Sequence, residues 1–552
     1  MSPELTSHTS KDHSPKDFER WGALPVHSRR AMVATADTDA TDAAVAVLRE
    51  GGSVVDAAIT AAFALCVTQP GMCGLGGGGH LLARLANGQT LCLDFREQAP
   101  HSASRDMFAD MPADASEAGW LAAATPGLVK GLAEAHRREG RLSWSRLLQP
   151  AIALAAEGHA VSYLRAQMLA GSAALRRNTE STRILLRDGH CFQPGEILRQ
   201  PELAATLERI AIYGEDEFYH GKTADLLTRA SIANGGALRL SDLDSFTCDE
   251  HQPLMYTYRG SEVWAMPPSS AGGIGLLQIL AMFEDTSFPA DAPLSSAFLH
   301  HLAEAMRRAF ADRADAIGDP SFIDNPKNLL DPNRLARLRA SIDPHRATPS
   351  AAFGPGVVLE ENTCTTHISI LDAEGNAAAL TITINGRYGS GVTVPGLGFL
   401  LNNNMDNFAK RPGHPNLYGV IHGEANAIAA GKRPLSSMAP TIVSRNGKAD
   451  LVLGTPGGPT IVSALAQVLL YILDFDWNPQ DAVNAPCIHH QWLPDTLFLE
   501  RGFPTDVTQA LEARGHRLQY RTSLTDINAI AARDGWLEGG VDPRRESCAA
   551  GI

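Results

Sequence analysis

A cysteine, two threonines and a histidine follow one another at Cys364–His367, where a loop leads into an expected strand. A threonine hydroxyl is a weak nucleophile while it keeps its proton, and serine and cysteine enzymes use a nearby histidine as base. A threonine that begins a chain can instead use its own α-amine, whose pKa of about 7.7–8.0 suits a general base. Thr365 is internal, so this chemistry requires cleavage before it, and its hydroxyl can itself attack the preceding carbonyl. The competing interpretation is a strand rich in β-branched residues, which needs no chemistry.

A second candidate is the Thr455–Gly458 run (TPGG), which follows an expected strand and precedes an expected helix. Consecutive backbone N–H groups at the start of a helix stabilise a phosphate, a carboxylate or an oxyanion. A tight turn without a ligand is the competing interpretation. The paired hydroxyls of Ser436 and Ser437 (PLSSM) are also typical of a capping or turn motif.

Two further patterns resemble cofactor or metal sites, but both favour structural roles. Gly74–His80 (GLGGGGH) has the G-x-G-x-x-G spacing, yet a dinucleotide site needs a strand before it and a helix after it, and here the order is reversed. Close backbone packing, or a wall near a site, is favoured. His489 and His490 are adjacent and point to opposite faces of an extended segment, so they do not easily share a metal. The same holds for His300-His301.

The composition argues against several classes of partner. The 552 residues are 44% hydrophobic and 20% charged, as in ordinary globular proteins. Acidic residues outnumber basic ones, 61 against 47, which argues against nucleic-acid and anionic-membrane partners. The eight cysteines include no C-x-x-C pair and favour a reducing compartment. The polar N-terminus lacks the apolar segment of a signal peptide, and no run of 18 apolar residues occurs, so a cytoplasmic location is favoured.

The elements that position these residues are expected to be sheets covered by helices. Residues 1–28 look like a flexible tail, and two Ala-rich helices follow, separated by Gly51-Gly52. Residues 120–345 are mostly helical, and the segment 295–320 carries apolar residues on one face and arginines and acids on another. Residues 460–475 read as a buried helix.

Three hairpins are expected from alternating hydrophobicity around turn residues. They turn at Asn87-Gly88, at Asp372–Asn376 and at Asn446-Gly447. Thr365 would stand at the head of the second hairpin, and the TPGG run would follow the third.

Ten short motifs occur in a particular order along the chain: EGGSVVDAAI, GLGGGG, LDFREQAP, TPGLV, MPPSSAGGI, TTHISILDAEGNA, LLNNNMDNF, GKRPLSSMAPTIV, GTPGG and NAPCIHHQWLPD. Together they resemble the γ-glutamyltranspeptidase (glutathione hydrolase) family, over roughly residues 30 to 545. Each motif is weak alone, and the combination is highly specific.

The resemblance implies an α+β fold of the N-terminal-nucleophile hydrolase type, a four-layer αββα sandwich made as one chain and cut into two associated subunits. The family cuts before the first threonine of T-T-H, here between Cys364 and Thr365. After the tail 1–28, the large subunit would be 29–364 and the small subunit 365–552, and both would form one domain. A cysteine before the cut leaves open a cleavage one residue earlier, with Cys364 as the nucleophile.

The resemblance also implies roles for individual residues. Thr365 would be the nucleophile, with Thr383 supporting its hydroxyl and the N–H groups of Gly457 and Gly458 forming the oxyanion hole. The substrate-binding residues would be Arg96 for the α-carboxylate, its partners Ser436 and Ser437, Asn385, and Tyr418 of a lid over the acyl pocket.

The sequence departs from the family pattern where the substrate's α-ammonium would bind. The family usually has Glu or Gln followed by Met-Asp-Asp-Phe, and both ends of that run contact the amine. Here the run is NMDNF, so Asn404 and Asn407 stand at those positions, and Asp406 should face away if the segment is extended. Charge-assisted hydrogen bonds are about twice as strong as neutral ones, so a γ-glutamyl amine should be held less well and glutaryl-type acyl groups become plausible.

The sequence therefore predicts an enzyme that cleaves γ-glutamyl amides, such as glutathione-like molecules, through an acyl-threonine intermediate released by water or by an amino acid or peptide acceptor. No metal or organic cofactor is implied. A glutaryl or cephalosporin-type acylase is the alternative, and an unprocessed, inactive binding protein is a remote one. Many bacterial relatives are exported, which leaves a periplasmic or secreted location as an alternative to the cytoplasm.

Overall fold

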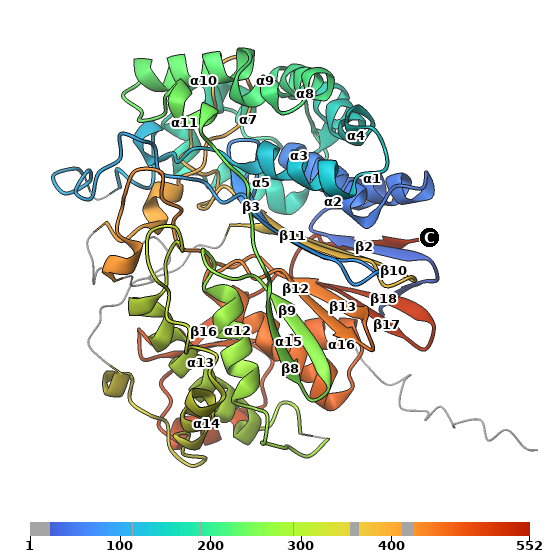
Figure 1. Ribbon diagram of the computed structural model, residues 1–552, viewed down its shortest axis with the longest axis vertical. Coiled ribbons are helices and arrows are strands. Elements are labelled where there is room, and N and C mark those ends of the chain that lie inside the picture. Colours follow the sequence, from blue (N-terminus) through green and yellow to red (C-terminus); the bar gives the residue numbers. More distant parts are fainter. Residues whose placement is uncertain (1–22, 113, 188, 291, 354–363, 411–422) are drawn as a thin grey trace, which may run out of the picture.

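Two seven-stranded antiparallel sheets lie face to face at the centre of the molecule, and helices cover the outer face of each (Figure 1). The computed structural model describes residues 23–112, 114–187, 189–290, 292–353, 364–410 and 423–552, without the side chains of residues 314–316. The arrangement is the four-layer αββα sandwich expected from the sequence.

The first sheet has the strand order β19 (Cys548–Gly551), β2 (Ala31–Thr35), β10 (Thr366–Asp372), β11 (Ala377–Thr383), β3 (Gly78–Arg84), β4 (Thr90–Asp94), β7 (Asp249–Glu250). The second has the order β1 (Val26–Ser28), β18 (Trp536–Val541), β17 (Asn528–Arg533), β13 (Lys448–Gly454), β12 (Thr441–Arg445), β9 (Ser261–Ala265), β8 (Leu254–Tyr258). Two small sheets comprise β5 (His159–Ala160) with β6 (Ile197–Leu198), and β14 (Ile488–His489), β15 (Leu497–Glu500) and β16 (Leu518–Arg521).

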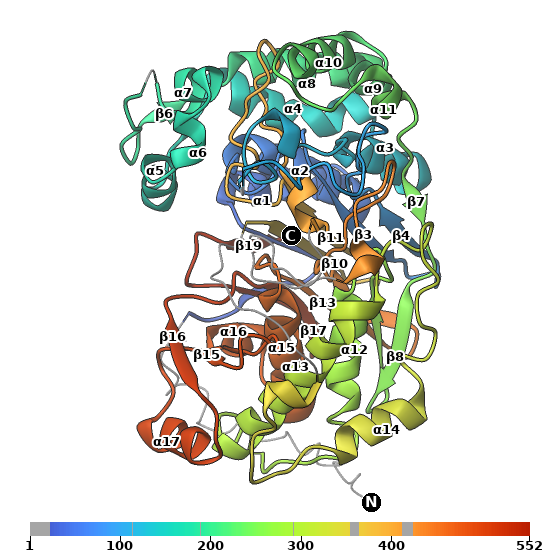
Figure 2. The ribbon, with the colours of Figure 1, turned by 90° about the vertical axis from the view of Figure 1, so that its left-hand side faces the viewer.

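The helices divide between the two outer layers (Figures 1 and 2). On the side of the first sheet lie α1 (Thr38–Arg49), α2 (Val54–Thr68), α3 (Leu128–Glu139), α4 (Trp144–Glu157), α5 (Tyr163–Ala170), α6 (Ala173–Arg176), α7 (Thr179–Leu185), α8 (Pro201–Tyr213), α9 (Asp216–Tyr219), α10 (Lys222–Ala233) and α11 (Leu240–Asp244). On the side of the second lie α12 (Gly272–Ala281), α13 (Ser296–Ala316), α14 (Pro332–Ala340), α15 (Thr460–Phe475), α16 (Pro479–Asn484) and α17 (Thr505–Ala513).

The three expected hairpins are confirmed as β3–β4, β10–β11 and β12–β13. In the third, Asn446 and Gly447 both have positive φ, 52° and 80°, as the favoured two-residue turn requires. The β10–β11 register pairs Thr366 with Ile382, so Thr365 lies at the open end of this hairpin beside Thr383.

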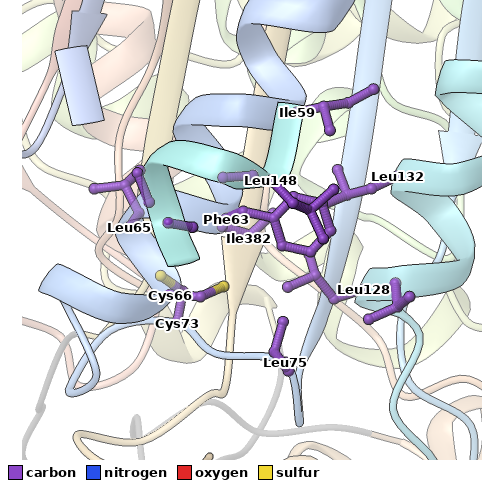
Figure 3. Packing of buried hydrophobic residues seen from close by; sticks show 14 of the residues in the cluster. Ile59, Phe63, Leu65, Cys66, Cys73, Leu75, Leu128, Leu132, Leu148 and Ile382 are labelled. Carbon is purple, nitrogen blue, oxygen red and sulfur yellow. The ribbon is translucent and has the colours of Figure 1, made fainter. Parts of the chain in front are cut away.

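Buried apolar side chains fill the three spaces between the four layers. In the outer space on the first sheet, Phe63 of α2 packs with Leu128, Leu132, Leu148 and Ile382 (Figure 3). The cluster between the sheets has fewer residues; it includes Met32, Ala34, Leu82, Cys92, Leu371, Ile442 and Val452. This packing holds β10 and β13 together, and therefore also Thr365 and the turn that follows β13.

The glycine run that leads into β3 serves close backbone packing, as the sequence favours. A Cβ on Gly77 would lie 2.1 Å from the Thr383 carbonyl oxygen, and one on Gly79 would lie 2.4 Å from that of Thr381. Both distances are shorter than real Cβ contacts, so only glycine lets this segment approach β11. The run thus fixes the strand that carries Thr383.

The structure differs from the sequence expectations at two places. Val26–Ser28, assigned to the flexible tail 1–28, form β1 and pair with β18; residues 1–22 lie outside the described part of the chain. The mostly helical region 120–345 contains the β8–β9 hairpin, which extends the second sheet beside β12. Both segments are short, and strands of this length complete a sheet formed by distant residues.

All eight cysteines belong to the described part of the chain, and none forms a disulfide. Among the described helices, none is both long and apolar enough to cross a membrane.

Candidate active site

Thr365 lies immediately before β10, with its side chain against its own preceding carbonyl group. The Thr365 hydroxyl donates to the Cys364 oxygen at 2.7 Å, and the Thr383 hydroxyl donates to the same oxygen at 3.1 Å. The two hydroxyl oxygens are 3.3 Å apart. A carbonyl that accepts two hydrogen bonds is polarised, and the hydroxyl that would attack it is already within reach.

Asn385 orients Thr383. It adopts a left-handed conformation with φ 74°, which asparagine tolerates better than most residues. This turns its backbone N–H onto the Thr383 oxygen at 2.8 Å, so the Thr383 proton remains directed at the Cys364 carbonyl. The carboxamide of Asn385 donates to the Asn403 carbonyl at 3.0 Å, which holds the turn.

His367, the third residue of the T-T-H triplet, is not placed to act as a base. It is fully buried between the sheets and bonds the Thr381 and Ser369 hydroxyls at 2.8 and 3.0 Å. Burial lowers its pKa to about 3, so the imidazole is neutral at working pH. Its structural position leaves the α-amine of Thr365, once free, as the base that the site offers.

Cys364 is also unsuited to nucleophilic attack. Its side chain is fully buried, and burial raises the pKa of the thiol to about 11, against the opposing effect of Arg387. The thiolate is the reactive form, so this environment disfavours the alternative in which Cys364 is the nucleophile.

The turn after β13 brings two backbone N–H groups to the same pocket. Gly457 and Gly458 have positive φ, 139° and 55°, which favours glycine at both positions. Neither N–H donates a hydrogen bond to another described residue. Gly458 lines the pocket with Thr365, and α15 begins two residues later at Thr460. The turn can therefore stabilise negative charge that develops beside Thr365.

Arg96 enters the pocket from the loop after β4. It is 3% exposed; its Nε donates to the Pro434 carbonyl at 3.2 Å and its Nη1 approaches the Glu97 carboxylate at 3.4 Å. These contacts orient the guanidinium toward Ser436 and Ser437, which line the same pocket. A guanidinium with two hydroxyls beside it matches a carboxylate.

Asn404 and Asn407, the two positions of the amine-binding prediction, form a connected group with Asn385. The Asn407 amide donates to the Asn385 and Asn404 side-chain oxygens at 2.8 and 2.7 Å. Asn404 lies behind Asn407 and does not line the pocket. Residues 404–407 form a 3₁₀ turn, not an extended segment, yet Asp406 still faces away, toward Ser116 at 3.1 Å and Lys410 at 2.6 Å.

Glu97 is a site residue that the sequence reasoning missed. It is fully buried, and burial raises the pKa of its carboxyl to about 7, while Arg96 and Asn404 act to lower it. The sequence feature that could have identified Glu97 is its position directly after Arg96. A carboxyl group with a pKa of about 7 that contacts Arg96 can adjust the charge beside this guanidinium.

The structure thus brings most of the predicted residues to one pocket of about 380 Å³, part of it open to solvent. Its lining comprises Arg96, Arg313, Thr365, Thr383, Asn385, Asn407, Leu435, Ser436, Ser437, Met438, Gly458, Pro459 and Ile461. Three predicted residues are not part of this lining. Gly457 precedes Gly458 in the turn, Asn404 lies behind Asn407, and Tyr418 falls outside the described residues. Arg313, on α13, was not predicted.

The adjacent histidines have the structural roles expected. His489 is buried between the Ser463 hydroxyl at 2.7 Å and the Gln491 side chain at 2.9 Å, and His300 bonds His516 at 2.7 Å. Within the described ranges, no group of three or more His, Cys, Asp or Glu side chains could hold a metal ion.

A threonine at the head of a central strand, in a sandwich of two antiparallel sheets between helical layers, defines the class of N-terminal-nucleophile hydrolases. The solved structure of a cephalosporin acylase from Bacillus halodurans supports this class: it matches with a TM-score of 0.85 and 26% identity, covering 98% of this chain and 99% of that chain.

Sequence comparisons narrow the class to a family. The family model described as gamma-glutamyltranspeptidase matches residues 40–552. The glutathione hydrolase proenzyme of Escherichia coli K12 is 40% identical over 529 residues, 94% of this chain and 91% of that protein. That of Pseudomonas aeruginosa is 41% identical over 541 residues, 95% of this chain and 96% of that protein. The chain belongs to the γ-glutamyltranspeptidase family.

Proposed function

We propose that this chain is a γ-glutamyltranspeptidase-like enzyme that cleaves γ-glutamyl amides, with Thr365 as an N-terminal nucleophile. The observation that carries the proposal is the pair of hydroxyls, Thr365 and Thr383, on the Cys364 carbonyl in a pocket that also contains Arg96. The relatives named glutathione hydrolase proenzymes support both the substrate class and a precursor that is processed.

Maturation would begin with attack of the Thr365 oxygen on the Cys364 carbonyl carbon. The C–N bond to Thr365 breaks, its nitrogen takes up a proton, and an ester links Cys364 to the Thr365 oxygen. Water then hydrolyses this ester, which releases a carboxylate at Cys364 and a free hydroxyl and α-amine at Thr365. The products would be the subunits 1–364 and 365–552, which stay associated because β10 and β11 are central strands of a sheet shared with β2 and β3.

In turnover, the Thr365 oxygen would attack the γ-amide carbon while its α-amine accepts the proton and passes it to the leaving amine. Gly457 and Gly458 N–H groups would stabilise the oxyanion, an interaction that contributes about 2.7–4 kcal/mol per donor in other hydrolases. Water, or an amino acid or peptide acceptor, would then release the acyl group from Thr365.

Arg96, Ser436 and Ser437 would bind the α-carboxylate of the acyl group, and Asn407 would accept one hydrogen bond from its α-ammonium. The missing carboxylate at 407 favours a second candidate function, an acylase for glutaryl-type groups that lack this amine. The same nucleophile and oxyanion turn would serve both reactions.

Asn407→Asp separates the two candidates. A hydrogen bond to a charged group contributes about 1.5–3 kcal/mol, against about 0.5–1.5 for a neutral pair. We expect the substitution to raise kcat/KM for γ-glutamyl-4-nitroanilide relative to glutaryl-4-nitroanilide by several-fold, on the order of 1 kcal/mol. The Asn404 carboxamide, whose oxygen accepts from Asn407, can present its Nδ2 donor to the new carboxylate by rotation.

Asn87→Asp is the matched control, because it makes the same charge change in the exposed β3–β4 turn and should leave the ratio unchanged. An unaltered ratio in Asn407→Asp would show that position 407 does not face the amine. The acylase candidate would then lose its main support, and γ-glutamyl transfer alone would remain.

A further inference from the structure

Arg313 is a buried cation in the wall of the active-site pocket. It lies near the end of α13, is 6% exposed, and lines the pocket together with Thr365, Asn407 and Gly458. Its Nε and Nη1 atoms have no hydrogen-bond partner in the part of the chain that the structure describes. The guanidinium carbon lies 5.9 Å from the centroid of the Phe310 ring.

Two other arginines of the same helix show how this protein normally buries such a group. Arg307 bonds Glu304, Ser350 and Asp495, and Arg308 bonds Glu304 and the Ser341 side chain and carbonyl. Each is 1% exposed and has at least one carboxylate partner. Removing a charge from water is costly unless an opposite charge and hydrogen bonds replace the water, and at Arg313 the described residues do not supply them.

The pKa of Arg313 also indicates that no carboxylate pairs with it among the described residues. Burial lowers the pKa of Arg313 to about 10, with no carboxylate acting to raise it, so the group is still a cation at neutral pH. His489, whose pKa the Arg313 charge helps to lower, is neutral and bonds Ser463 of α15. Arg313 lines the pocket together with Ile461 of α15, the helix that the oxyanion turn begins.

The position of Arg313 differs from that of Arg96. Arg96 follows β4 in the first sheet, whereas Arg313 comes from the helical layer outside the second sheet, where α13 lies close to α12 and α15 (Figures 1 and 2). Arg96, with Ser436 and Ser437 in the same pocket, would bind the α-carboxylate of the acyl group. A second guanidinium in the same pocket, which has no carboxylate partner among the described residues, points to a second anionic group on the substrate, separate from the one that Arg96 would bind.

We propose that Arg313 binds a carboxylate on the amine half of the substrate, which is the free C-terminus of the peptide released from a γ-glutamyl peptide. The same contact would receive the carboxylate of an amino acid or peptide acceptor. This inference rests on the γ-glutamyl amidase function proposed above and narrows it: the preferred donors are γ-glutamyl peptides with a free C-terminus, in preference to neutral γ-glutamyl amides.

The test compares two substrates with the same acyl group, γ-glutamylcysteinylglycine and its C-terminal amide. For the processed parent enzyme we expect kcat/KM to be about 10- to 100-fold higher for the free acid, the range expected for hydrogen bonds between charged groups. Arg313→Met keeps an apolar stem but removes the guanidinium, and it should reduce this ratio to near one by lowering kcat/KM for the free acid far more than for the amide. Arg313→Lys keeps the charge but loses the planar guanidinium that binds a carboxylate through two donors, so it should retain part of the preference for the free acid.

Arg96→Lys is the matched control, because a defect on the acyl side should lower kcat/KM for both substrates by the same factor. An equal loss on both substrates in Arg313→Met would assign Arg313 to the acyl group and overturn the inference. If the variants fail to fold, the parent enzyme still decides: equal rates for acid and amide overturn the inference. Failure to cleave either substrate would instead refute the proposed function itself.

Discussion

Thr365→Ala is expected to yield a single uncut chain with no measurable turnover of γ-glutamyl substrates. The substitution removes the hydroxyl that donates to the Cys364 carbonyl at 2.7 Å, and with it both the autoproteolytic group and the catalytic nucleophile. Loss of the nucleophile costs on the order of 10⁶-fold in kcat in a well-studied serine hydrolase. A denaturing gel and a γ-glutamyl-4-nitroanilide assay measure the two effects.

Thr365→Ser is the control for that experiment, since it keeps the hydroxyl and should still split and retain activity. Thr366→Ser, one residue later, alters a fully buried side chain and should leave processing in place. A chain that still splits when residue 365 is alanine would show that another group performs the cleavage.

Arg96→Lys should leave processing normal while kcat/KM for γ-glutamyl substrates falls by about 10- to 100-fold, mainly through KM. Lysine keeps the charge, but it loses the planar fork that Pro434 and Glu97 hold in place. Steady-state kinetics on the purified, processed protein give the split between KM and kcat.

Arg84→Lys is a suitable control for this loss, because Arg84 is a buried arginine that pairs with Glu262 at 3.8 Å and does not line the pocket. It lies at the opposite end of β3 from Gly78, about 20 Å along the strand. Equal kinetics in Arg96→Lys and the parent enzyme would exclude Arg96 from carboxylate binding.

Local sequence signals predicted the elements around the nucleophile well. Turn residues such as Asn446-Gly447 fix a hairpin through their own backbone preferences, and alternation assigns each strand's faces. The same signals could not find β1 or the β8–β9 hairpin, because these strands are stabilised by pairing with β18 and β12, far away in the sequence.

In the candidate site, too, local motifs indicated some residues, whereas others depend on tertiary packing. Thr365, Arg96 and the glycine pair could be predicted because whole motifs carried them. Arg313 could not, since periodicity on 295–320 groups the arginines on one face but does not reveal that tertiary packing buries this face. Glu97 belongs to the LDFREQAP motif, yet only its burial, which the sequence does not reveal, raises the pKa of its carboxyl to about 7.

N-terminal sequencing of the smaller fragment of the purified wild-type protein tests the central claim most directly. The account predicts that this fragment begins Thr-Thr-His, with an intact mass that matches residues 365–552. A fragment that begins at Cys364 would transfer the nucleophile role to the thiol. A single uncut chain that nevertheless cleaves γ-glutamyl amides would contradict the account, because Thr365 would then have no free α-amine.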